Sequence, residues 1–85
     1  MVKINILNKA YSHNDEYYYI IVRKNIKRYR IEKRLTQQNL ADMTDLTRQY
    51  ICDIENEKRN KHITIHSLGR IAEALDIDIE YFFKK

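Results

Sequence analysis

Four neighbouring side chains in the middle of the chain could bind a polar ligand: Thr47, Arg48, Gln49 and Tyr50. They precede Ile51 and Ile54, whose spacing would anchor one side of a helix and turn the polar residues outward. The donors of an arginine match the edge of guanine, and the amide of a glutamine matches adenine. The cluster is therefore interpreted as an edge that contacts base pairs in the major groove of double-stranded DNA.

Residues suited to catalysis or metal binding lack the context that such chemistry needs. Ser12 and Ser67 stand in no nucleophile motif, and a single glycine, Gly69, cannot build a loop that cradles a phosphate. His62 and His66 are four residues apart, but His62 falls before the predicted start of a helix and no third ligand is evident. We therefore expect no enzyme activity, no metal site and no cofactor.

Charge and composition restrict the class of protein. The 85 residues suffice for one compact domain, and Lys and Arg outnumber Asp and Glu by 16 to 12. Eleven basic and six acidic side chains fall within residues 20–61, so the positive charge surrounds the polar cluster and favours a polyanionic partner. The longest apolar run, "YYYIIV", is too short to span a bilayer, so no membrane partner is expected. The single cysteine, Cys52, fits a reducing cytoplasm, and its side chain is predicted to face the DNA or an interface.

The lack of proline and the single glycine favour an all-α fold. Residues 1–17 are the least regular part of the chain. Apolar and polar residues alternate in "VKINI", which leaves a mobile tail, a short strand or an arm as alternatives. Residues 18–85 are expected to form the helical domain, and its first helix is predicted to end near residue 33.

Four further helices follow from capping residues and apolar spacing. Threonines that can cap a helix start precede three of them: Thr36, Thr47 and Thr64. Asp78 can cap a last short helix, which makes five helices in a compact domain. Gly69 lies inside the helix that Thr64 starts, and it is interpreted as a close-packing site.

The stretch "TQQNLADMTDLTRQYICDIE" resembles the helix-turn-helix of the lambda-repressor-like family, the Cro and xenobiotic-response-element type regulators. The family pattern is T/S-Q-x-x-L-A, a tight turn, an apolar residue and a helix that ends in I/L-E. Its places are held here by Thr36, Gln37, Leu40, Ala41, Leu46, Ile51, Ile54 and Glu55. The run "RQYICDIENEKRN" is also similar to the controller proteins of restriction–modification systems. The resemblance covers residues 20–83. It implies a compact lambda-repressor-like fold of five helices with a short N-terminal arm, in a bacterial or phage-encoded cytoplasmic protein that joins the nucleoid when bound.

The resemblance also implies roles for residues outside the polar cluster. Gln37 would bind a DNA phosphate and brace the recognition helix, whereas the plainer alternative is an exposed glutamine in a first turn. Three residues lie where the family's loop grips the DNA backbone, although a generic polar loop is an alternative: Arg59, Asn60 and Lys61. Arg30 and Glu55 would form a structural ion pair across a partly buried gap, unless they are two unrelated surface charges.

Several of these assignments remain open. The polar cluster as a whole could be an ordinary solvated helix face. Thr47 could serve only as a cap, and Tyr50 could contact a phosphate or pack beside the preceding helix. Asp53 could accept a hydrogen bond from cytosine, exclude other base sequences, or pair with Arg59.

Two departures from the family pattern concern glycine. The family usually has glycine in the turn where Asp45 stands, and aspartate tolerates a left-handed backbone better than most residues. The family often has glycine where Glu57 stands, and Asn56 is expected to take the left-handed conformation instead.

The C-terminal end "LDIDIEYFFKK" carries more apolar side chains than a short helix can bury against its own core. A symmetric dimer interface is therefore predicted from four of them: Ile79, Tyr81, Phe82 and Phe83. Complete burial in the core, or an interface through "VKINI", is the alternative.

One helix-turn-helix spans only a few base pairs, so we expect a homodimer on a pseudo-palindromic operator. The predicted function is a sequence-specific transcriptional regulator, a repressor or a controller of a mobile element or a restriction–modification system. The alternative is an antitoxin that binds and neutralises a partner protein.

Overall fold

Helices account for all regular structure in the part of the chain that the structure describes, residues 16–59 and 61–85. The computed structural model has four α-helices there: α1 (Tyr17–Glu32), α2 (Gln37–Thr44), α3 (Arg48–Glu55) and α4 (Ile65–Leu75). Two short 3₁₀-helices complete the order: η1 (Glu57–Arg59) and η2 (Ile79–Phe83). The all-helical class is confirmed for these residues. The predicted arm or tail lies outside them, apart from Glu16 and Tyr17.

The prediction of a fifth α-helix is wrong, because residues 79–83 form only the 3₁₀-helix η2. Asp78 accepts no capping hydrogen bond at its start, so this segment lacks the cap that stabilises the starts of α2, α3 and α4. The carbonyl groups of this end are bonded to α1 instead. Nδ2 of Asn25 donates to the carbonyl oxygens of Phe82 and Lys84, at 2.7 Å in each case. Asn25 therefore holds the C-terminal segment against α1.

Threonine side chains start three of the helices, as predicted. The hydroxyl oxygens of Thr36, Thr47 and Thr64 each accept a hydrogen bond from the backbone N–H three residues later, at 2.9, 3.0 and 3.0 Å. Each bond satisfies one of the N–H groups that a helix start leaves without an intrahelical partner. Asn39 accepts a bond of 2.9 Å from the Thr36 N–H in return, which completes a capping box.

Within residues 16–59 and 61–85, three residues other than glycine take the left-handed conformation within two residues of a helix end. Asp45, with φ of 60°, does so in the turn between α2 and α3, as its tolerance of this conformation predicted. Arg34 (φ 60°) and Asp76 (φ 55°) follow α1 and α4 in the same way, which was not predicted. The expectation for Asn56 is wrong, because its φ of −95° is extended. Its Oδ1 accepts a bond of 2.9 Å from the Lys58 N–H, and this side-chain bond turns the chain instead.

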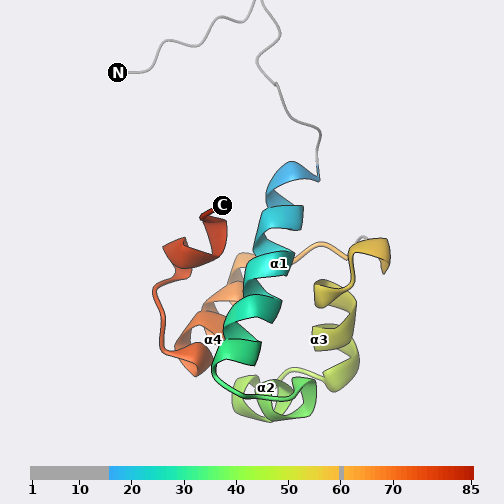
Figure 1. Cartoon of the computed structure of the whole chain (residues 1–85). Helices are drawn as coiled ribbons and strands as arrows, with labels where there is room; N and C mark the ends of the chain where they lie inside the picture. The colour runs from blue at the N-terminus through green and yellow to red at the C-terminus, as the bar shows by residue number, and fades with distance from the viewer. Residues whose placement is uncertain (1–15, 60) are drawn as a thin grey trace, which may run out of the picture.

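The core lies where α1, α3 and α4 meet, and α2 crosses one end of the molecule (Figure 1). Residues with no exposed surface come from every α-helix and from η2: Ile26, Leu40, Ile51, Ile54, Ile71 and Phe82. One stripe of α4 faces this core, since Leu68, Ile71, Ala72 and Leu75 are all buried. This core fixes α2 and α3 relative to α1. No helix in the described part of the chain is long and apolar enough to cross a membrane.

Gly69 is not the close-packing site that its position inside α4 suggested. A Cβ atom placed there would meet nothing within 4 Å beyond its chain neighbours and the backbone of its own helix. Glycine therefore weakens α4 at this point, and no steric need for it is evident.

Candidate nucleic-acid interface

The two sides of α3 carry different side chains. Ile51 and Ile54 have no exposed surface and anchor the helix on the core. Arg48 and Gln49 are exposed on the first turn, and Cys52 is half-buried one turn further along. The polar side chains at the start of α3 are therefore accessible to a partner.

Thr47 and Tyr50 have clear structural roles beside this face. The Thr47 hydroxyl caps α3 by accepting a hydrogen bond of 3.0 Å from the Tyr50 N–H. Tyr50 is half-buried against the core, and its hydroxyl is buried without a hydrogen-bond partner among the described residues. The Lys61 ammonium lies 5.8 Å from the centre of its ring. Of the two alternatives for Tyr50, packing fits this geometry better than a phosphate contact, because its hydroxyl is not accessible.

Asp53 is held by side chains on both sides. Nε2 of Gln49 donates to its Oδ1 at 2.9 Å, and Nε of Arg59 lies 3.9 Å from the same oxygen. The pairing with Arg59 was one of the three alternatives for Asp53. In this arrangement Asp53 orients Gln49 on the exposed face of α3.

The loop after α3 carries three exposed basic side chains, Lys58, Arg59 and Lys61, and the last two were predicted to contact the DNA backbone. Asn60, which was assigned to the same contact, lies outside the described residues. The loop is tied to α1 through Arg23, whose Nη2 donates to the Lys61 carbonyl oxygen at 2.7 Å. Arg23 is only 1% exposed. Sequence reasoning missed this residue, although its place one residue after Val22 brings it close to the apolar stripe of α1.

A small polar cluster at the start of α1 reinforces this tie. The His62 ring stacks on Tyr19 with centroids 4.4 Å apart, and its Nε2 lies 3.1 Å from Oε2 of Glu16. The other carboxylate oxygen of Glu16 lies 3.7 Å from Nη1 of Arg23. His62 is therefore a structural contact of the loop. Within residues 16–59 and 61–85, no group of three His, Cys, Asp or Glu side chains could hold a metal ion.

Glu55 joins three helices at the other end of α3. Arg30 of α1 donates to both of its carboxylate oxygens, from Nε at 2.7 Å and from Nη2 at 2.9 Å. Nε2 of Gln37, the first residue of α2, donates to Oε1 at 3.1 Å. Arg30 and Glu55 are 8% and 9% exposed, so this is a nearly buried ion pair. The pair braces α3, and Gln37 is oriented by it.

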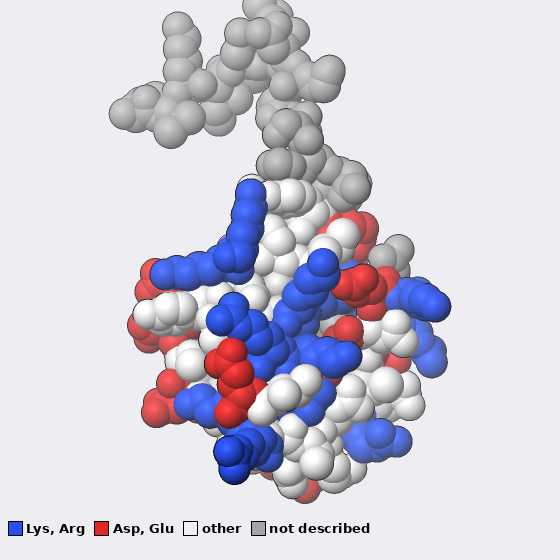
Figure 2. Space-filling view, in the orientation of Figure 1, with Lys and Arg blue, Asp and Glu red and all other residues white. Residues whose placement is uncertain are grey.

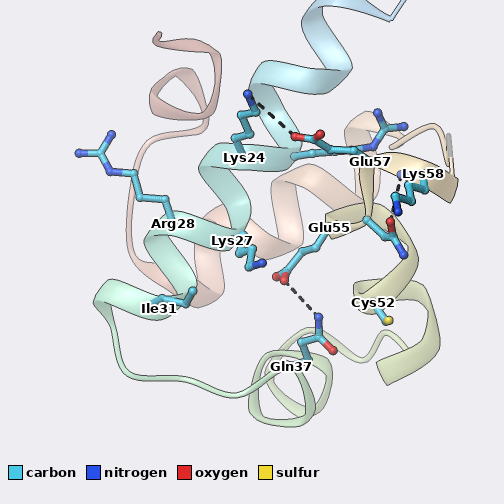
Figure 3. A pocket seen from close by; sticks show the side chains of 11 residues that line it. Lys24, Lys27, Arg28, Ile31, Gln37, Cys52, Glu55, Glu57 and Lys58 are labelled. Atoms are coloured by element: carbon cyan, nitrogen blue, oxygen red, sulfur yellow. Dashed lines mark hydrogen bonds and ion pairs between the residues drawn. The ribbon is translucent and has the colours of Figure 1, made fainter.

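A groove of about 680 Å³ runs between α1 and α3 (Figure 3). Five basic side chains line this α1–α3 groove: Arg23, Lys24, Lys27, Arg28 and Lys58. The acidic lining residues are Glu55 and Glu57. Figure 2 shows Lys and Arg side chains gathered on this face of the molecule. Sequence reasoning did not assign the groove, although the spacing of Lys24, Lys27 and Arg28 places them on one face of a helix.

The predicted dimer surface needs a correction. Phe82 has no exposed surface, because it fills the core between α1 and α4, so it cannot lie at an interface of this fold. Ile79 is half-buried, and Tyr81 and Phe83 are 41% and 42% exposed. Phe83 also lines an apolar groove of about 390 Å³ between α1 and α4, beside the 72% exposed Ile65.

The helices α2 and α3 are short and are joined by a tight turn. Glu55 fixes the end of α3, and the exposed first turn of α3 is polar. This arrangement defines a helix-turn-helix protein. Comparison of the sequence with known families agrees with this class. The Helix-turn-helix family (HTH_3, the Cro/C1 type) matches residues 26–82. The chain belongs to this family.

The relatives that match the chain are regulatory proteins by name. An uncharacterized HTH-type transcriptional regulator of Rickettsia conorii is 41% identical over 61 residues, which are 72% of this chain and 47% of that protein. Control protein C.SmaI of Serratia marcescens is 34% identical over 69% of this chain and 68% of its own length. The chain thus spans less than half the length of the Rickettsia relative.

Among solved structures, the restriction–modification controller protein C.Esp1396I superposes with a TM-score of 0.70 and 36% identity. The match covers 79% of this chain and 84% of the controller. These three relatives are regulators or controllers rather than enzymes, which agrees with the expectation that the chain has no catalytic site.

Proposed function

We propose that the chain is a DNA-binding transcriptional regulator that recognises the major groove with the first turn of α3. The observation that carries this proposal is the exposure of Arg48 and Gln49 on a helix whose far end is fixed by Glu55. A recognition helix must present donors and acceptors in a fixed orientation, because each base pair shows a distinct pattern in the major groove. Membership of the Helix-turn-helix family supports the same function.

The proposed base contacts come from α3. Arg48 donates to a guanine, and Gln49 forms paired hydrogen bonds with an adenine. Asp53 supports Gln49 through their 2.9 Å bond. Thr47 acts as the cap of the helix, so its hydroxyl is occupied by the Tyr50 N–H. Sequence preference is therefore assigned to Arg48 and Gln49, with Asp53 in a supporting role.

The proposed backbone contacts flank α3 on both sides. Gln37 keeps one N–H of its amide for a phosphate while the other is bonded to Glu55. Arg59 and Lys61 extend from the loop that Arg23 holds in place. Asn60 remains a contact predicted from the sequence. Phosphate contacts of this kind set the register of the protein on the duplex but carry no base information.

We infer further that the protein acts as a homodimer on a pseudo-palindromic operator, with residues 18–85 as the functional unit. The interface is assigned to the exposed parts of η2, Tyr81 and Phe83, together with the half-buried Ile79. A symmetric interface needs a self-complementary apolar surface, which these side chains supply. The names of similar proteins support a role as a repressor or a controller, since they include an immunity repressor protein and the restriction–modification controller C.Esp1396I.

The test is to footprint the purified protein on the DNA upstream of its own gene and to titrate the protected site at several salt concentrations. We expect protection of two half-sites about one helical turn apart. Affinity should fall steeply with salt, because phosphate contacts release condensed counterions. Binding that is unchanged between low and high salt would contradict the proposal.

A further inference from the structure

The α1–α3 groove carries more positive charge than its acidic neighbours can neutralise. Glu55 is already bonded to Arg30 and Gln37, and Glu57 lies 3.9 Å from the ammonium of Lys24. Lys27 and Lys58 form no ion pair within the part of the chain that the structure describes. Two lysines therefore face the groove without a counter-charge.

The groove is continuous with the proposed base-contacting face of α3. Cys52 lines it, and Cys52 lies four residues after Arg48, so both belong to one face of the helix. Gln37, the proposed phosphate contact at the start of α2, lines the groove as well. In Figure 3 the groove lies between these two positions and the basic side chains of α1. A polyanion that touches Gln37 and the exposed face of α3 is thus brought to the entrance of the groove.

We infer that the α1–α3 groove is a second binding site for the sugar-phosphate backbone of the duplex whose bases α3 contacts. This inference rests on the proposed function. It adds phosphate contacts from α1 and η1 to those proposed for Gln37, Arg59 and Lys61. Lys27 and Lys58 bind the phosphates directly. Glu57 restrains Lys24 and repels phosphates at the same edge of the groove.

The form of the groove favours a continuous polyanion over a small anion. Its lysines are exposed and come from different elements, so their donors do not converge on one point. Flexible lysines act as point charges that can follow successive phosphates along a strand. A small anion such as free phosphate needs several fixed donors around it, which this surface does not supply.

The experiment measures the salt dependence of binding to the footprinted site by fluorescence anisotropy, for the intact chain and for Lys27→Gln and Lys58→Gln. Each substitution removes one phosphate contact. The slope of log affinity against log salt, which is negative, should therefore become less steep by roughly 0.9. At 0.1 M salt this corresponds to binding weakened by roughly eightfold, on the operator and on random DNA alike. Both lysines are exposed, so thermal unfolding should be unchanged in both variants.

Lys84→Gln is the matched control. It also removes one positive charge, but Lys84 follows η2 and does not line the α1–α3 groove, so the salt slope should be unchanged. If Lys27→Gln and Lys58→Gln behave like Lys84→Gln while Lys61→Ala lowers the slope, the groove inference is wrong and the proposed function stands. If the intact chain binds no duplex, the proposed function itself fails. Saturable binding of inorganic phosphate that Lys27→Gln abolishes would also overturn the inference.

Glu57→Gln gives a test in the opposite direction. The substitution removes a negative charge from the groove and releases Lys24, so binding should become several-fold tighter with a steeper salt slope. Unchanged or weaker binding would show that phosphates do not approach this edge of the groove, which contradicts the inference.

Discussion

Glu55 is a single carboxylate that holds side chains from α1 and α2, and the effect of removing a partner can be measured. Replacing Arg30 by methionine leaves Glu55 nearly buried with only Gln37 as a partner. Because an unpaired buried charge is costly, the free energy of unfolding should fall by about 3–5 kcal/mol. Urea denaturation of the two proteins measures the difference.

Arg28 supplies the control for this prediction. Its pair with Glu32 is a single contact of 3.0 Å between exposed side chains four residues apart. Arg28→Met should therefore lower the free energy of unfolding by no more than about 0.5 kcal/mol. The double variant Arg30→Met with Glu55→Met should recover much of the stability lost on removing Arg30 alone. Equal losses for Arg28→Met and Arg30→Met would contradict the structural role of the buried pair.

Arg48 and Gln49 are predicted to determine sequence preference. Replacing either by alanine should weaken operator binding by about 1–3 kcal/mol and leave binding to random DNA nearly unchanged. Lys61→Ala should weaken both, because a phosphate contact is independent of sequence. Competition titrations with operator and random duplexes separate these outcomes. Losses of equal size on both DNAs for all three variants would exclude the assignment.

Among single residues, the sequence predicted those whose role follows from their type and spacing. The polar first turn of α3 could be identified because the isoleucines beside it must face the core. Arg23 could not be identified, because arginine is usually exposed and its partner here is the carbonyl group of Lys61, distant in sequence. For Asp53 the sequence left three alternatives, and its contacts with Gln49 and Arg59 depend on side-chain positions that the sequence does not record.

Among the elements, α4 offers a simple test of helix stability. Gly69→Ala should raise the free energy of unfolding by roughly 0.5–1 kcal/mol, because glycine lowers helix stability and the added Cβ meets nothing within 4 Å. Thermal unfolding followed by circular dichroism measures this gain. A lower melting temperature would mean that this face of α4 is covered by another molecule in solution.

The helix starts were predictable and the last element was not, for a physical reason. A cap is a local bond between a threonine and the N–H three residues later, so its signal is contained in four residues of sequence. The form of η2 depends on Asn25, which captures the Phe82 and Lys84 carbonyls from another helix. No local pattern records that contact. The extended conformation of Asn56 was missed for a related reason, since its side chain bonds the Lys58 N–H.

For the whole molecule, the oligomeric state is the principal prediction. The intact chain should have the mass of a dimer in solution, and Tyr81→Glu combined with Phe83→Glu should give monomers. Both side chains are more than 40% exposed, so the charges should prevent association without disturbing the core around Phe82. Light scattering after gel filtration measures the mass.

Deletion of residues 1–15 is the companion experiment, and this variant should remain a dimer. If only the deletion yields monomers, the interface lies in the N-terminal segment instead. The sequence predicted that the end of the chain carries surplus apolar residues. It could not assign them to core or surface, because this depends on which side of η2 faces α1.

The bracing of α3 by Arg30, Glu55 and Gln37 has a consequence for the DNA rather than for the protein. A recognition helix fixed at its start by Thr47 and at its end by Glu55 has little freedom to adjust when two half-sites are imperfectly placed. In the proposed complex with a dimer, the duplex must then bend or twist to meet the α3 helices of both protomers, and the energy required depends on the stiffness of the base steps between them. Operators should therefore differ in strength through base pairs that no side chain touches. Exchanging a flexible TA step at the centre of the operator for a stiff A-tract should change affinity while every contacted base stays the same.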